Sequence, residues 1–305
     1  MNEIVNDIKS LEIETLNNLK NSKSHNTLRA YESDYKDFSA FCAKNNFSSL
    51  PADPKILSLY LTNLSKTSKF STLKRRIASI SVIHKLKGHY VDTKHPIIME
   101  NLLGIKRRKG SNQKAKKPIL INDLRAIIDV INQSNDKEIR KLRDKALILV
   151  GFAGGFRRSE LVALDFEDVE FVREGVKIFV RRSKTDQSGE GMTKAIPSFD
   201  NAIYCPVVSL QNWIYELKNK KGKIFSISDK SVALIIKKYA NLAGLDGSKY
   251  AGHSLRSGFA TSTAESGAEE RNIMAMTGHK TTQMVRRYIQ EANLFKNNAL
   301  NKIKI

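Results

Sequence analysis

Apolar residues recur along the first hundred positions at the three- and four-residue spacing of amphipathic helices. The pattern is weak over residues 1–23, which we predict to form an N-terminal arm. It sharpens after Ser24, a residue suited to cap a helix, and another apolar stripe follows Pro51 and Pro54. The apolar positions are Leu28, Tyr31, Tyr35, Phe38 and Phe41, then Ile56, Leu57, Tyr60, Leu61 and Leu64, then Leu73, Ile77, Ile80 and Ile83. We therefore predict a small all-helical domain over residues 24–103.

The second half of the chain combines helical and strand patterns. Helices are predicted over residues 122–132 and 137–153, and a short helix follows in SELVAL. The segments FEDVEFV, VKIFVRR and MTKAIPSF have strand composition, and the polar SKTDQSGEG between the last two is typical of a hairpin loop. Further helices are predicted near 207–218, 231–243, 254–266, 269–276 and 281–290. The predicted fold class is mainly α with a small antiparallel β-sheet (α+β), and residues 119–305 form the second domain.

Positive charge distinguishes this chain from most globular proteins. It has 305 residues with 52 Lys+Arg and 31 Asp+Glu, a net charge of +21. Residues 104–118 (GIKRRKGSNQKAKKP) contain only basic charges, so we predict an extended basic linker between the domains. An excess of this size favours nucleic acid as the partner. We expect Lys74, Arg75 and Arg76, on the exposed face of the third helix, and Lys106, Arg107, Arg108 and Lys109, in the linker, to contact DNA.

Several functional classes are disfavoured by what the sequence lacks. It has no apolar run long enough to cross a membrane and no signal-peptide pattern, and its two cysteines cannot form a disulfide framework. We therefore expect a cytoplasmic protein with no membrane partner. Walker, HExxH and GxSxG motifs and a zinc-spaced Cys/His cluster are missing, and the acidic residues do not group as a two-metal nuclease requires. The sequence predicts no metal and no cofactor.

Four basic segments remain as candidates for chemistry: GGFRRSEL at 154–161, RRSKTDQ around Lys184, GHSLRSG at 252–258 and TGHKTTQMVRRYIQ at 277–290. Taken alone, each segment has a simpler structural explanation. In order, these are a surface ion pair, a solvated turn, a buried structural histidine and a core tyrosine. His253 and Arg256 are three residues apart at a helix start, so both can face one side. Gly278 can end one helix, which places His279 at the break.

In their order and spacing, these segments resemble the tyrosine recombinases, the phage-integrase family. GGFRRSEL is similar to the family's first arginine box, so Arg157, rather than Arg158, takes the catalytic position and Glu160 supports it. Lys184 lies where the family carries its hairpin lysine. GHSLR supplies His253 and Arg256, TGH supplies His279, and RRYI places the nucleophile at Tyr288. TLRAYESDYKDFSAFC also resembles the helical core-binding domain, so the resemblance covers roughly residues 24–290 and implies a catalytic domain over 119–305.

The resemblance implies a site-specific recombinase or integrase that cleaves and rejoins DNA through a 3′-phosphotyrosyl intermediate, without metal or ATP. Tyr288 would attack the phosphodiester, and Arg157 and Arg256 would clamp the charge that develops on the phosphate. His253 suits proton handling near the nucleophile, and His279 would donate to the phosphate. Lys184 would protonate the leaving 5′-oxygen, and Lys194 on the following strand is the next candidate. The family often has a second histidine where Ser257 stands, and TGH replaces LGH.

Family behaviour implies a homotetramer on two sites of double-stranded DNA. The tail residues Leu294, Phe295, Leu300 and Ile303 could then dock on a neighbouring subunit or on their own domain. Two alternative functions share parts of this pattern: a type IB topoisomerase-like enzyme that relaxes DNA, and a non-catalytic DNA-binding regulator. The helical domain favours the recombinase over the topoisomerase, and the complete catalytic set argues against the regulator.

Overall fold

The computed structural model describes residues 2–110, 116–182, 186, 190–218, 220–292 and 299–303. The chain divides into two compact units, Met1–Lys114 and Ala115–Ile305. In the described part, no helix is both long enough and apolar enough to span a membrane.

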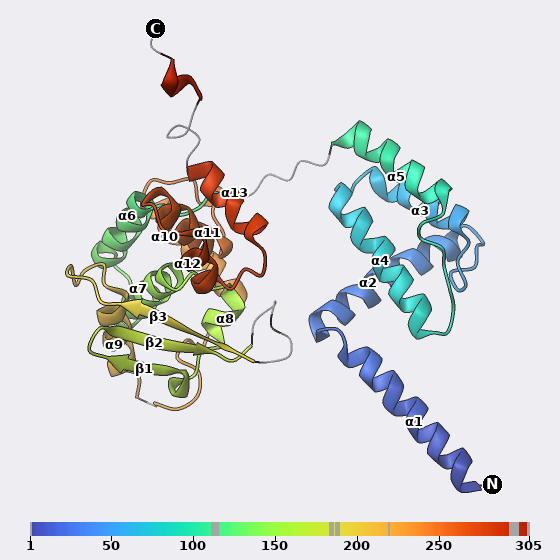
Figure 1. The fold of residues 1–305 in the computed structure, drawn as a ribbon, viewed down its shortest axis with the longest axis horizontal. Coiled ribbons are helices and arrows are strands. Elements are labelled where there is room, and N and C mark those ends of the chain that lie inside the picture. The colour runs from blue at the N-terminus through green and yellow to red at the C-terminus, as the bar shows by residue number, and fades with distance from the viewer. Residues whose placement is uncertain are drawn as a thin grey trace. The chain divides into compact units, whose positions relative to one another are not determined.

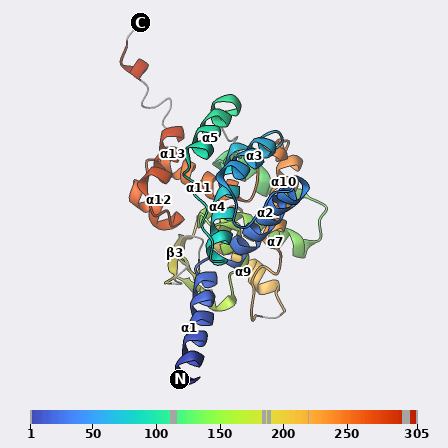
Figure 2. The same cartoon turned by 90° about the vertical axis from the view of Figure 1, so that its right-hand side faces the viewer.

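The first unit is all-helical, as predicted. It contains α1 (Asn2–Asn21), α2 (His25–Lys44), α3 (Pro54–Ser65), α4 (Phe70–Leu86) and α5 (Pro96–Lys109). Ser24 caps α2 by accepting a hydrogen bond from the Thr27 N–H, and α2 packs on α4 while α3 packs on α5. The core includes Phe38, Leu57, Tyr60, Leu61, Leu73 and Ile80. The segment predicted as an arm is the helix α1, which projects away from the other four (Figures 1 and 2).

The prediction of an extended linker from residue 104 is wrong for its first six residues. They form the last turns of α5, because Ile98, Leu102 and Ile105 recur at helical spacing and are buried. Lys109 Nζ donates to the carbonyls of Ser65 and Ser68, at the C-terminal end of α3. Carbonyls at a helix end lack intrahelical partners, so this lysine caps α3.

The second unit surrounds the buried helix α7 (Glu138–Ala153), against which α6 (Ile121–Gln133), α9 (Pro206–Glu216) and α11 (His253–Glu265) pack. A short helix α8 (Arg158–Val162) follows α7. The remaining helices are α10 (Asp229–Leu242), α12 (Glu270–Thr277) and α13 (Thr282–Ala292), with 3-10 turns at Phe166–Asp168, Gly247–Lys249 and Ala299–Lys302. Helices α7, α11, α12 and α13 carry or support the residues considered below.

The predicted antiparallel sheet is confirmed. Its strands are β1 (Val169–Val172), β2 (Gly175–Val180) and β3 (Met192–Pro197), in the order β1-β2-β3. Val176, Ile178, Val180 and Ile196 are buried, and Lys194 lies on the same buried face of β3 as Ile196. The alternation of strand residues therefore places one lysine where an apolar side chain is expected.

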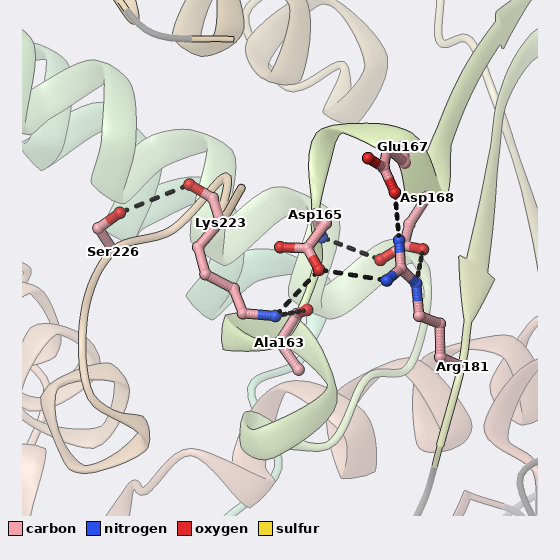
Figure 3. A network of polar contacts seen from close by, with 7 residues as sticks. All are labelled: Ala163, Asp165, Glu167, Asp168, Arg181, Lys223 and Ser226. Atoms are coloured by element: carbon pink, nitrogen blue, oxygen red, sulfur yellow. Dashed lines mark hydrogen bonds and ion pairs between the residues drawn. The ribbon is translucent and has the colours of Figure 1, made fainter. Parts of the chain in front are cut away.

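An ion-pair network anchors the end of β2 (Figure 3). Arg181 contacts Asp165, Glu167 and Asp168, with Nε 2.5 Å from Asp168 Oδ1. Lys223 Nζ donates to the Ala163 carbonyl and pairs with Asp165, which ties the loop around Lys223 to the same place. The network fixes the strand end that precedes residues 183–189.

Candidate active site

Arg157 lies in the turn between α7 and α8, where it is the N-cap of α8. Glu160, one turn later, is only 3 % exposed, and its carboxylate accepts hydrogen bonds from the Arg157 backbone N–H and guanidinium. Gly155 permits this tight turn, since its φ is +54° and a Cβ would press on Phe259 and Thr277. Arg158 instead pairs with Asp229 at 4.0 Å. The buried Glu160 carboxylate thus holds Arg157 in place.

Arg256 is a fully buried guanidinium beside the same turn. It is 1 % exposed, and its Nη1 donates to the Gly155 carbonyl over 2.9 Å. Its Nε and Nη2 atoms are also buried and have no hydrogen-bond partner among the described residues. Burial, followed by the charge of Arg157, lowers the pKa of Arg256 to about 10, so it stays charged at neutral pH. A buried donor without a partner costs about 1–3 kcal/mol, and more on a charged group, so this site is suited to an anion.

His253 and Tyr288 come together from α11 and α13. The Tyr288 hydroxyl lies 3.5 Å from His253 Nε2. Helix α13 packs on α11 and α12 through the buried side chains Ala260, Ala264, Ile273 and Val285, and Tyr288 lies against this cluster. Because the Tyr288 ring is held by packing, its hydroxyl can remain beside the imidazole.

His279 follows Gly278, which ends α12 with φ of +62°, so the predicted helix break is confirmed. Its ring centroid is 6.1 Å from that of Tyr288, and it is 7 % exposed. Its Nδ1 lies 2.7 Å from the Thr277 hydroxyl. Burial, and then the charges of Arg256 and Arg157, lower the pKa of His279 to about 4, so the ring is neutral at pH 7.

The structure thus brings together Arg157, Glu160, His253, Arg256, His279 and Tyr288, six of the residues that the resemblance named. Lys184 lies outside the described residues. The flanking Asp186 is described, and its carboxylate accepts from the N–H groups of Glu190 and Gly191. Ser257, where the family often has a second histidine, bonds back to the carbonyls of His253 and Ser254.

Two further residues of the site were not assigned a place in it from the sequence. Lys194 was only a reserve candidate, yet its ammonium is buried near both arginines. Its position at an inward-facing register of β3 was a usable signal. For Thr277, whose hydroxyl contacts His279, the sequence offered no indication beyond its position two residues before that histidine. Within the described part of the chain, no three His, Cys, Asp or Glu side chains gather as they would around a metal ion.

The predicted DNA-contacting residues differ in their surroundings. Lys74 is exposed and lies over the Phe70 ring, and Arg75 is half exposed while pairing with Asp34. Arg76 was expected on the exposed face, and this is wrong. Its side chain is only 16 % exposed because it pairs with the buried Asp34 and with Asp37.

In the last turn of α5, Lys106 and Arg107 are exposed, and no side-chain hydrogen bond or ion pair holds them within the described residues. Arg108 and Lys109, in contrast, contact the end of α3. Of the tail residues, Leu300 and Ile303 are exposed, and Leu294 and Phe295 lie outside the described residues.

The site groups two arginines with a tyrosine and a histidine, an arrangement that is suited to an anion. The model of the phage integrase family matches residues 119–294, more than half of the chain. An "Integrase/recombinase xerD homolog" from Selenomonas ruminantium is 40 % identical over 317 positions, covering 99 % of this chain and 92 % of the relative. Tyrosine recombinase XerD from Haemophilus ducreyi is 25 % identical, covering 87 % and 88 %.

Two solved structures share the fold. A post-cleavage complex of the XerH site-specific recombinase with palindromic difH has a TM-score of 0.61 at 17 % identity, covering 81 % of this chain and 73 % of that one. A lambda integrase dimer on a COC′ core site has a TM-score of 0.60 at 17 % identity and covers 93 % of both chains. The chain therefore belongs to the phage integrase family, the tyrosine recombinases. It is a site-specific recombinase, an enzyme that breaks and rejoins DNA.

Proposed function

We propose that this recombinase cleaves DNA with Tyr288 and that Arg157 and Arg256 bind the scissile phosphate. The observation that carries the proposal is the buried Arg256 guanidinium, whose Nε and Nη2 lack partners among the described residues. Two oxygens of one phosphate would satisfy both donors in bidentate geometry. The Arg157 guanidinium is close enough to lower the pKa of Arg256, and an anion between the two relieves this repulsion.

In the proposed first step, the Tyr288 oxygen attacks phosphorus and its proton passes to His253, 3.5 Å away. The bond to the 5′-oxygen breaks, Lys184 gives that oxygen a proton, and a 3′-phosphotyrosyl ester remains. The arginines stabilise the charge gathered on the non-bridging oxygens. Attack by a 5′-hydroxyl of another strand reverses each step and rejoins the DNA, so no ATP is required.

His279 would donate a hydrogen bond from Nε2 to a phosphate oxygen. The neutral imidazole has one ring proton, and its Nδ1 lies 2.7 Å from the Thr277 hydroxyl. The Thr277 hydroxyl has a single proton, which it donates to the Ile273 carbonyl over 2.6 Å, so Nδ1 keeps its proton and donates to Thr277. Donation from Nε2 would then require the imidazolium, the form that a bound phosphate anion favours.

DNA binding would extend to the basic side chains of the first unit. Lys74, Arg75, Lys106 and Arg107 are half exposed or fully exposed and suit phosphate contacts. Arg76, Arg108 and Lys109 would support the fold that presents them. We place the reaction in the cytoplasm, consistent with the unpaired, buried Cys42 and Cys205.

We further propose that four chains assemble on two DNA sites, since exchange requires two sites to be cut in one complex. Mass photometry with DNA that carries the site selected by this protein from a random library should show four chains and two duplexes. Complexes that never exceed one chain on one duplex would contradict this assembly.

A plasmid carrying two copies of the selected site in direct repeat tests the function. The wild-type chain should delete the intervening DNA, and Tyr288→Phe should not. Relaxation of supercoils without deletion would favour the topoisomerase-like alternative. Site binding with neither reaction would favour the non-catalytic regulator.

A further inference from the structure

Lys194 places a buried ammonium group behind the proposed active site. It is 1 % exposed, on the inward face of β3. Its Nζ donates to the Gly154 carbonyl over 2.7 Å and to the Met276 carbonyl. The same atom lies 4.8 Å from the centre of the Phe156 ring. Two carbonyls and an aromatic face thus surround its three N–H groups, and none is left to protonate a leaving group.

The two carbonyls belong to the C-terminal ends of two helices. Gly154 is the C-cap of α7, and Met276 is in the last turn of α12. Helix C-termini carry partial negative charge and unpaired carbonyls, so they stabilise a cation. No carboxylate lies within ion-pair distance of Nζ in the described part of the chain. This explains how a lysine can be buried here without an acidic partner at contact distance.

Each helix end leads directly to a residue of the site. Arg157 follows Gly154 by three residues, and His279 follows Met276 by three residues. Arg256 binds the next carbonyl of the first turn, that of Gly155. The turn that carries Arg157 is therefore held by two cations, and one of these also holds the turn that carries His279.

We propose that Lys194 is a positioning residue, whose ammonium joins the ends of α7 and α12 so that Arg157 and His279 reach the same phosphate. This inference rests on the proposed roles of those two residues. Burial lowers the pKa of Lys194 to about 8, with Arg256 and Arg157 adding to this and Glu160 opposing it, so the charged form predominates at pH 7. The nearby charges face it from α8, α11 and the turn before α8.

Lys194→Met tests the role, because it keeps an unbranched apolar side chain and removes the donors. On a nicked duplex carrying the selected site, we expect cleavage to fall by about 10²-fold, the cost of a small misplacement of reacting groups. DNA affinity and cooperative unfolding should be kept. Lys177→Met is the matched control, since Lys177 is an exposed lysine on the neighbouring strand β2, 3.7 Å from Glu170. It should cleave like the wild type.

Two readouts separate positioning from other roles. A substrate with sulfur replacing the 5′-bridging oxygen needs no acid, so it should not restore cleavage by Lys194→Met. In a His279→Ala background, Lys194→Met should cost less than it does in the wild type, because part of its effect acts through His279. If the sulfur substrate restores cleavage by Lys194→Met, Lys194 is the general acid. If the effects of Lys194→Met and His279→Ala are fully additive, Lys194 has only a structural role. Either result would overturn the proposal.

If Lys194→Met does not fold, Lys194→Gln carries the test. Its amide falls one atom short of the ammonium position, so it cannot bridge both carbonyls, and we expect a similar loss of cleavage without rescue by sulfur. Wild-type rates in either variant would contradict the role of Lys194 alone. A wild-type chain that fails to cleave any selected site would contradict the proposed function instead.

Discussion

Arg256 and Lys194 are both buried cations, but their hydrogen bonds are completed in different ways. Lys194 has carbonyl partners and a ring face within the protein. Arg256 has one carbonyl partner and two buried nitrogens without a partner among the described residues. Lys194 is thus suited to hold the site together and Arg256 to bind its ligand.

His279 should make the stability of the protein depend on pH. Its pKa falls from 6.5 in the unfolded chain to about 4 in the folded one, so the unfolded chain binds more protons between these values. The contribution of His279 to the free energy of unfolding is therefore fully present above pH 6.5. It is lost as the pH falls toward 4, by about 3 kcal/mol at most. In urea unfolding over a pH series, the free energy of unfolding of His279→Gln should fall less between pH 6.5 and pH 4 than that of the wild type. An identical fall in both proteins would mean that His279 is not buried as a neutral ring.

Lys184 is predicted from sequence alone to be the general acid. Lys184→Ala should cleave ordinary DNA more slowly by a factor of about 10²–10⁴. A 5′-bridging sulfur leaves as a thiolate, whose conjugate acid has a pKa of about 8.5, so this substrate should restore cleavage. Arg157→Ala and Arg256→Ala are the controls and should gain little. If Lys184→Ala also gains nothing from sulfur, the acid is a different group.

At the scale of elements, the patterns with one buried face were predictable. Helices α2, α3, α4, α6 and α7 and the three strands lie close to the predicted ranges, because their apolar spacing records the face that is buried. No helix was predicted over Pro96–Lys109, and residues 104–109 were assigned to the linker, because four consecutive basic residues hide the apolar spacing of Ile98, Leu102 and Ile105. Composition describes charge, and it does not show that Lys109 bonds to α3.

The resemblance to the tyrosine recombinases proposed Arg157, His253, Arg256, His279 and Tyr288 as site residues, and the structure brings these side chains together. The contacts between residues distant in the chain could not be predicted from the sequence. Nothing local indicates that Lys194 reaches the ends of α7 and α12 or that Asp34 draws Arg76 out of the exposed face.

The last turn of α5 offers a test of which basic residues meet DNA. Replacing Lys106 and Arg107 by Ala should lower the slope of log K against log salt by up to about 0.9 per lost contact, without changing unfolding. Replacing Arg108 and Lys109 should instead destabilise the first unit, because the end of α3 loses its cap. Anisotropy over a salt series and thermal unfolding measure the two effects. Equal slopes for both pairs would contradict this division.

At the scale of the whole molecule, two separately packed units share a net charge of +21. The second unit contains every described residue proposed for chemistry, and the first presents basic side chains on α4 and α5. A charge of this size promotes association with DNA of any sequence. Under the proposed function, cleavage depends on how accurately the second unit holds one phosphate between two arginines and a tyrosine.

Mapping the covalent DNA–protein bond tests that claim most directly. The chain has nine tyrosines, so the position of the bond is informative. After reaction with a nicked duplex carrying the selected site, mass spectrometry should find the nucleotide on Tyr288. Tyr288→Phe should bind without forming the adduct. Tyr250→Phe, which alters a buried tyrosine bonded to Asp123, should still form it. An adduct on another tyrosine, or one that survives in Tyr288→Phe, would contradict the account.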